Sequence, residues 1–317
     1  MKSKLLTRVL PLLLFALAIG LAVITIVHDR HQLGPAVSRI GPTAIVLATI
    51  SAMLGVAASA EVWRQVLIGL GAHPPAGVAA RVFFPSQLGK YLPGSVWPVV
   101  AQMEFGRRVG INRRRMLSAN ALALVLGLAV GLVVAGVCLP LSSTAALHRY
   151  WWTFAFLPLM IVCLHPRLVP GVIDAVFRRL GRESIDARLP VRGSLRASTW
   201  SALSWLGMGT QVYLLARPFT GGGSALFLAS LGGMALAVSA GILVIPVPAG
   251  AGIRDAVLLA TLAPALHATD AFAVALVSRA SLIAVDLLLA GLVLVVTSRS
   301  GKHEPVVSGV IDDAYLD

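Results

Sequence analysis

The sequence predicts an all-α protein, a polytopic integral membrane helical bundle of about seven or eight spans with one or two re-entrant or broken helices. Two observations lead to this fold class. Hydrophobic residues make up 57% of the chain and charged residues only 12%, whereas soluble domains carry about a quarter charged residues. Apolar runs close to the ~20 residues that a helix needs to cross a bilayer also recur along the chain. This composition excludes a soluble globular fold.

The spanning helices are predicted from these apolar runs, in chain order. They are Val9–Val27, Thr43–Ala60, Leu117–Leu139, Tyr150–Leu164, Ala197–Ala216, Gly223–Ile245 and Ala271–Val296, with a shorter run at Gly252–Leu266. The first run follows Lys2, Lys4 and Arg8, as a signal peptide would, but it lacks a small-residue cleavage site, so we expect a membrane anchor. Residues 1–300 are expected to form a single transmembrane domain, and residues 301–317 a short disordered acidic tail.

The positions of Lys and Arg predict the orientation of the chain, because cytoplasmic loops carry an excess of both. With a cytoplasmic N-terminus, and with Gly252–Leu266 counted as a crossing, the basic stretches Arg81–Arg115 and Arg167–Arg196 both fall inside. We therefore expect a multi-pass protein of the cell (plasma) membrane whose N-terminus is cytoplasmic. The net charge of +13 is then attributed to loops that face the anionic inner leaflet. No nucleic-acid partner is expected, and recruitment of an anionic lipid headgroup by these loops stays open.

The stretch Arg81–Gln102 is too apolar for an aqueous loop and too rich in Pro and Gly for a plain helix. Broken backbone at membrane depth is tolerated only where it is buried in protein or lines a cavity. We therefore expect a re-entrant or kinked helical hairpin that breaks around Pro93 and Gly94. Free N–H groups at such a break suit an anion such as phosphate, and Lys90 adds a positive charge. The alternative is a proline-kinked packing element whose Lys90 reaches the membrane surface.

A second interruption, Ile245–Leu266, is again rich in Pro and Gly and leads into a short apolar helix. Two broken segments in corresponding parts of a membrane protein are the best sequence indication of a transporter's binding site. Arg254 and Asp255 lie at the start of the short helix. Their alternative role is to pair with charges at the cytoplasmic leaflet.

Two charged residues interrupt the last predicted span. Arg279 and Asp286 are seven residues apart, about two helical turns, so they share one face of a helix. Each costs ~2.5–3.5 kcal/mol in lipid on insertion scales, so both are expected to face the interior of the bundle. Either they neutralise each other, or Arg279 binds a lipid phosphate through its planar guanidinium.

A family pattern is present in the second interruption. The matching residues are Pro246, Pro248, Ala249, Gly250, Gly252 and Asp255. They resemble the signature Pro-x-Pro-Gly-Gly-x-Gly-x-x-Glu of the transmembrane, flippase-like domain of lysylphosphatidylglycerol synthases, a family also found as stand-alone membrane proteins. Ala249 and Asp255 depart from that signature conservatively. Pro93-Gly94 followed by Arg107-Arg108 is similar to an earlier element of the family, and Arg279 is similar to an arginine of its last span.

The resemblance implies a protein that moves or handles lipids between leaflets. Lysyl-lipid synthesis belongs to a separate soluble domain for which the 317 residues leave no room, so we expect no enzyme. The expected function is an integral membrane lipid transporter, flippase-like, for an anionic lipid or a polyprenyl-phosphate-linked sugar. The expected lipid-binding residues are Lys90, Pro93, Gly94, Pro248, Gly250, Gly252, Arg254, Asp255, Arg279 and Asp286.

Two other classes of function stay open. A membrane glycosyltransferase that uses polyprenyl-phosphate sugars would need carboxylates in an outer loop, where the sequence offers only Asp29 and, at the margin, Asp270. An accessory subunit of a cell-envelope glycoconjugate pathway would need membrane partners from that pathway. We expect no catalytic residue, cofactor or metal, because the seven histidines are scattered and the chain has no Walker motif.

Overall fold

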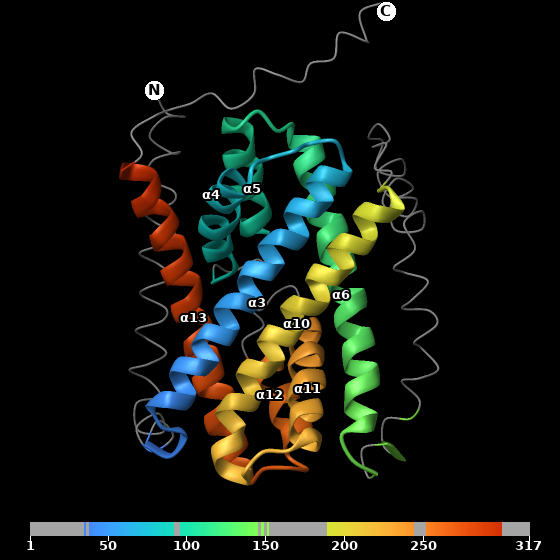
Figure 1. Cartoon of the computed structure of the whole chain (residues 1–317), viewed down its shortest axis with the longest axis vertical. Helices are drawn as coiled ribbons and strands as arrows, with labels where there is room; N and C mark the ends of the chain where they lie inside the picture. Colours follow the sequence, from blue (N-terminus) through green and yellow to red (C-terminus); the bar gives the residue numbers. More distant parts are fainter. Residues whose placement is uncertain are drawn as a thin grey trace, which may run out of the picture.

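The computed structural model describes residues 35, 38–91, 96–144, 147–148, 151, 189–243 and 252–299. Every regular element within these ranges is a helix (Figure 1). The α-helices are α3 (Pro42–Gly69), α4 (Ala76–Gln87), α5 (Trp97–Arg108), α6 (Arg113–Leu141), α10 (Val191–Thr220), α11 (Ser224–Leu243), α12 (Ile253–Leu262) and α13 (Ala268–Arg299), and a 3-10 helix, η1 (Leu88–Tyr91), follows α4. The predicted all-helical fold class is confirmed for this part of the chain.

Four helices in the described ranges are long and apolar enough to cross a membrane. They are Pro42–Gly69, Arg113–Leu141, Ser224–Ile242 and Ala268–Thr297. Each contains most of one predicted apolar run. The run Ala197–Ala216 also lies within a single helix, α10. The runs at residues 9–27 and 150–164 fall outside the described residues apart from Trp151, so the total of seven or eight spans stays a prediction.

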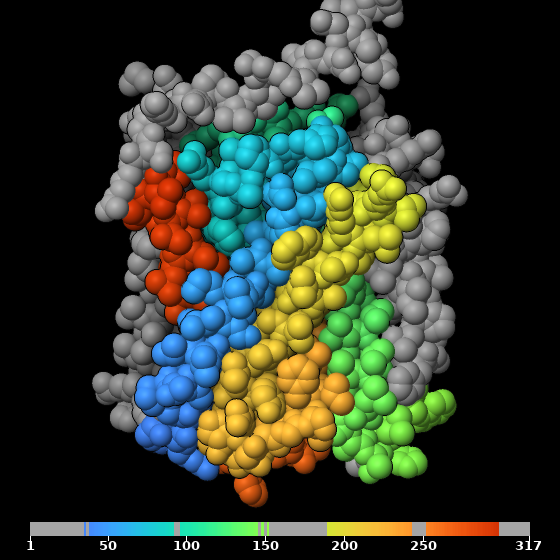
Figure 2. All heavy atoms as spheres, viewed as in Figure 1, coloured from blue at the N-terminus to red at the C-terminus, as the bar shows by residue number. Residues whose placement is uncertain are grey.

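Helices α3 and α10 form the frame of the molecule and lie side by side along its length (Figures 1 and 2). Two glycines bring their backbones together, because a Cβ on Gly207 would lie 2.8 Å from the Cα of Gly55. Two serines also form hydrogen bonds between α3 and α10. Ser51 Oγ donates a hydrogen bond to the carbonyl oxygen of Gly207, and Ser204 Oγ to that of Gly55, each at 2.8 Å. Small residues that permit close backbone approach are typical of helix pairs in membranes.

The first predicted break separates two short helices at one end of the molecule. We call this the basic end: α3 ends there, α6 and α10 begin there, and it carries Arg107, Arg113 and Arg192 (Figure 1). From it, α4 and η1 run toward the middle of the molecule and α5 returns. The chain is therefore helical on both sides of residues 92–95, which lie outside the described ranges.

The two arms of this hairpin touch where η1 meets the start of α5. A Cβ on Gly89 would lie 2.8 Å from the backbone nitrogen of Pro98. Pro98 occupies the first turn of α5, where the missing N–H costs nothing and the fixed φ favours a helix. Because α5 has 12 residues, it rises only ~18 Å, which is well short of a bilayer core of ~30 Å.

The second predicted break precedes α12, which packs against α11 at the opposite end of the molecule (Figure 1). A Cβ on Gly233 would lie 2.5 Å from the side-chain oxygen of Thr261, so the two helices are in close contact. The ten residues of α12 rise only ~15 Å, about half the thickness of a bilayer core. The run Gly252–Leu266, which was counted as a crossing on sequence grounds, therefore forms a helix that is too short to cross the bilayer. The predicted orientation is unaffected if α12 instead re-enters from the side on which α11 begins.

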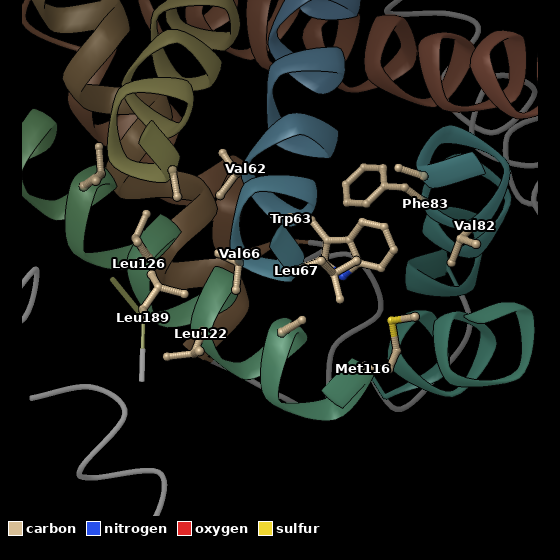
Figure 3. Packing of buried hydrophobic residues seen from close by; sticks show 14 of the residues in the cluster. Val62, Trp63, Val66, Leu67, Val82, Phe83, Met116, Leu122, Leu126 and Leu189 are labelled. Atoms are coloured by element: carbon tan, nitrogen blue, oxygen red, sulfur yellow. The ribbon is translucent and has the colours of Figure 1, made fainter. Parts of the chain in front are cut away.

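A packed hydrophobic cluster holds the first hairpin in place at the basic end. Figure 3 shows Trp63 and Val66 of α3 among side chains from α4 and α6. The rings of Trp63 and Phe83 lie 5.9 Å apart between centroids, and Met116 is fully buried beside them. A second cluster joins α3 and α10 to α11, α12 and α13. Helices α4, η1 and α12 also contact α13 directly.

Candidate functional site

A group of charged residues lies near the middle of the longest apolar helix. Within the candidate span Ala268–Thr297, Arg279 and Asp286 each lie about one helical turn from the centre. Asp286 is 2% exposed. Charged side chains at this depth are expensive and face the interior of a bundle or a polar cavity. Both residues are contacted by side chains from other helices, as the sequence predicted for an interior position.

The end of the first hairpin binds Asp286. Lys90 Nζ lies 2.6 Å from Asp286 Oδ2, and the hydroxyl of Tyr91 donates a hydrogen bond to the same oxygen at 2.5 Å. The Lys90 ammonium also lies 5.5 Å from the centroid of the Tyr91 ring. The 3-10 turn therefore places two successive side chains on one carboxylate oxygen of α13.

The start of α12 binds Arg279. Arg279 Nη1 lies 2.7 Å from Asp255 Oδ2, and the backbone N–H of Gly252 donates to the same oxygen at 3.1 Å. Gly252 precedes the first residue of α12 with a φ of 82°, a conformation that glycine adopts without the penalty a Cβ would bring. Asp255 thus caps α12 and also ties the start of this helix to α13.

The two ion pairs differ from the pairing considered on sequence grounds. Arg279 and Asp286 do not neutralise each other, because seven residues separate them by about 10 Å along the helix axis. Each takes a partner from a different broken segment instead. Asp255 likewise pairs with Arg279 rather than with charges at the cytoplasmic leaflet.

Arg254 belongs to the same group but has no carboxylate partner in the described ranges. Its Nε is buried without a hydrogen-bond partner, and its Nη2 lies 3.9 Å from the sulfur of Met234, a weak acceptor. Arg254 is close enough to interact electrostatically with Tyr91 and Asp286 as well as with its neighbours. Asp286 Oδ1 is also buried without a partner.

We call these residues the charged cluster. Its members are Lys90, Tyr91, Arg254, Asp255, Arg279 and Asp286. All except Tyr91 were predicted from the sequence. Tyr91 was overlooked although it follows Lys90 directly, because an aromatic residue in an apolar stretch gives no sign that its hydroxyl reaches a carboxylate. The predicted residues Pro93, Gly94, Pro248 and Gly250 lie outside the described ranges.

A metal centre finds no support in the described part of the chain, where no group of three or more His, Cys, Asp or Glu side chains could hold an ion. Asp270, the residue weighed for an outer-loop catalytic role, is bound by Arg39. Arg39 also stacks 4.8 Å over the ring of Phe219. This contact joins α10 and α13 to the residues just before α3 at the end opposite the basic end.

Comparison with protein families assigns the chain. Residues 13–290 match the family described as Lysylphosphatidylglycerol synthase TM region. The chain belongs to this family. The match extends from before α3 to within α13, and it contains every residue of the charged cluster. The resemblance inferred from the proline-glycine elements is therefore confirmed. No curated protein was found to match the chain.

Family membership and the four apolar helices identify a membrane protein, and they link it with lipid or cell-envelope processes. The charged cluster adds a chemical feature to this assignment. It combines three cationic side chains, two carboxylates and one phenol at the meeting point of two broken segments with α13.

Proposed function

We propose that this protein is a flippase-like lipid transporter, which moves an anionic lipid or a polyprenyl-phosphate-linked sugar between the leaflets of the cell membrane. The observation that carries the proposal is the charged cluster, where segments from opposite ends of the molecule bring charges to the middle of α13. Transporters commonly place their substrate sites at the midplane, where helices are discontinuous. Family membership agrees with a role in lipid handling.

The exposure of the charged side chains favours a ligand-binding site over a purely structural contact. The side chains of Lys90, Asp255 and Arg279 are 34%, 26% and 25% exposed, although they lie near the middle of an apolar bundle. Acyl chains cannot satisfy such groups. A polar ligand or water is therefore expected to reach them, as in a substrate pathway.

The balance of charge favours an anionic substrate. The charged cluster holds three cations against two carboxylates, and a surplus positive charge in a medium of low dielectric attracts an anion strongly. The phosphate of a lipid headgroup or of a polyprenyl carrier supplies that anion. We propose no catalytic role, and no observation favours the alternatives of a glycosyltransferase or an accessory subunit over transport.

A leaflet-exchange assay tests the proposal. The purified protein is reconstituted into liposomes with acyl-labelled fluorescent phosphatidylglycerol or phosphatidylcholine, and dithionite then bleaches the outer leaflet. We expect phosphatidylglycerol to cross several times faster than phosphatidylcholine and than either lipid in protein-free liposomes. The assay is repeated with a membrane potential and with a pH gradient, so that a driven transporter is also detected. Exchange at the protein-free rate under all three conditions would refute the proposal.

A matched variant controls for the state of the protein. Gly291 lies on α13, and a Cβ added there meets no atom within 4 Å. Gly291→Ala should therefore exchange lipid at the rate of the unmodified protein, because it leaves the charged cluster untouched.

A further inference from the structure

We infer that Arg254 is the residue that binds the anion in this site, and that the site accepts a headgroup with one negative charge, a phosphodiester. The inference rests on the proposed function and deepens it, because it separates the roles of the three cationic residues. Lys90 and Arg279 hold the broken segments on α13, whereas Arg254 binds the ligand.

Lys90 and Arg279 are already occupied. Each forms a short ion pair with a carboxylate, at 2.6 Å to Asp286 and 2.7 Å to Asp255. A phosphate that took either cation would leave a carboxylate near the middle of the membrane without its partner, and this is strongly unfavourable where the carboxylate is as buried as Asp286. Both cations are therefore engaged in holding the broken segments on α13 and are not free to bind the phosphate.

Arg254 differs from both. It has no ion-pair partner in the described part of the chain, its Nε is buried and unsatisfied, and its Nη2 contacts the thioether of Met234, a weak acceptor. A guanidinium can donate from Nε and Nη to two oxygens of one phosphate. A bound phosphodiester would replace the weak sulfur contact and satisfy the buried Nε.

The net charge of the cluster predicts the charge of the ligand. The two ion pairs are each neutral, so Arg254 leaves the charged cluster with a single positive charge. The undescribed residues 92–95 and 244–251 contain no Asp, Glu, His, Lys or Arg, and neither do the predicted spans at 9–27 and 150–164. One negative charge therefore neutralises the site. A phosphomonoester, whose second ionisation lies near pH 6, would bring close to two charges at pH 8.

Native mass spectrometry at pH 8 tests this assignment on the purified full chain. Phosphatidylglycerol, phosphatidic acid and phosphatidylcholine are titrated separately. We expect the unmodified protein to bind phosphatidylglycerol most tightly. Arg254→Gln should lose about 10- to 100-fold in affinity for it, the range for one charge-assisted hydrogen-bonded contact. Arg254→Lys should recover only part of the loss, because an ammonium cannot match the planar fork.

The matched control is Met234→Leu, which removes only the sulfur beside Arg254 and conserves volume. It should bind phosphatidylglycerol like the unmodified protein. If Arg254→Gln does not fold, the role of Arg254 is tested by comparing Arg254→Lys with Met234→Leu, since both variants keep a packed side chain. A soluble competitor, glycerophosphoglycerol, separates the sources of the phosphodiester. Competition at lipid-like concentrations would mean that the ligand is a free diester and would overturn the lipid assignment.

Equal phosphatidylglycerol binding by Arg254→Gln and the unmodified protein would overturn the role of Arg254. Tighter binding of phosphatidic acid would overturn the single-charge limit. Both readouts are independent of lipid movement. A protein that binds as expected but exchanges no lipid would contradict the proposed function alone, and a protein that exchanges lipid with Arg254→Gln unimpaired would contradict this inference alone.

Discussion

Asp286 is the most deeply buried charged residue of the cluster, and Lys90 and Tyr91 both contact its Oδ2 atom. Its side chain is 1% exposed, whereas that of its partner Lys90 is 34% exposed. Removing Lys90 therefore leaves a carboxylate that cannot reach water, but removing Asp286 leaves an ammonium that can. We expect Lys90→Met to lower the free energy of unfolding by about 3–5 kcal/mol. Asp286→Asn should cost only about 1–3 kcal/mol.

Chemical unfolding in mild detergent measures both losses, and the double variant should lose less than the sum of the two singles. An Asp286→Asn variant that is less stable than Lys90→Met would show that the burial of Asp286 is not what sets the cost.

Tyr91 is expected to contribute to stability through its hydroxyl. Tyr91→Phe removes the hydrogen bond to Asp286, and hydrogen bonds to charged groups contribute about 1.5–3 kcal/mol. The control is Tyr213→Phe in α10, because the Tyr213 hydroxyl makes no hydrogen bond in the described part of the chain. Thermal unfolding should show a clear loss for the first variant and almost none for the second. Equal melting temperatures would remove Tyr91 from the cluster.

At this scale, the sequence predicted which residues are interior but not which residues are paired. Arg279 and Asp286 were recognised because charges interrupt an apolar run. Their partners could not be predicted, because Lys90 lies far away in the sequence and is brought to α13 by the packing of α4 against α3 and α13. The sequence also carries no sign that Arg254 lacks a carboxylate partner in the described ranges, because the neighbouring Asp255 looked available, and the structure shows that Asp255 pairs with Arg279 instead.

Among the elements, the contact of α3 with α10 is the one most sensitive to a change in side-chain size. A side chain at Gly207 would collide with the backbone of Gly55 at 2.8 Å, and helix backbones cannot shift as a flexible side chain can. Overpacking costs about 1–3 kcal/mol and occasionally more. Gly207→Ala should therefore lower the free energy of unfolding by at least ~1 kcal/mol.

Gly291→Ala is the matched control for that variant, because it makes the same substitution in a helix with open space around it. Alanine is a better helix former than glycine by roughly 0.5–1 kcal/mol. The control should thus be as stable as the unmodified protein or slightly more so. If Gly207→Ala behaved in the same way, the two helices would not be in backbone contact.

The sequence predicted the existence and type of the elements better than their ends. The Pro and Gly residues of the first interruption mark the end of η1 and the start of α5 correctly. Helix α3 continues nine residues beyond the predicted end at Ala60, because its polar residues satisfy one another. Arg64 binds Glu61 at 2.7 Å, and Gln65 donates to the same carboxylate. A polar turn that is internally paired prolongs a helix where hydropathy alone predicts an end.

For the whole molecule, orientation is the most direct prediction to check. Cys138 and Cys163 are first replaced by Ala, and single cysteines are introduced at Arg192, at the basic end, and at His148, beyond the opposite end of α6. If the basic end faces the cytoplasm, an impermeant maleimide should label His148→Cys in intact cells and should label Arg192→Cys only after lysis. The reverse labelling pattern would invert the orientation.

The central claim is that two broken segments carry charged residues to the middle of the membrane. Depth measurement by electron paramagnetic resonance tests it with spin labels at Gln87, the last residue of α4, and at the exposed Ala256, beside Asp255. Reference labels are placed at Arg192 and Ser224, at the two ends of the molecule. Collision rates with oxygen and with a water-soluble nickel complex then give the depth of each label in a phospholipid bilayer.

We expect both test labels to lie within about 10 Å of the centre of the ~30 Å hydrocarbon core, deeper than either reference label. A label at Gln87 or Ala256 that reports the headgroup depth of the references would contradict the claim, because that segment could not then bring its charges to a lipid phosphate inside the membrane.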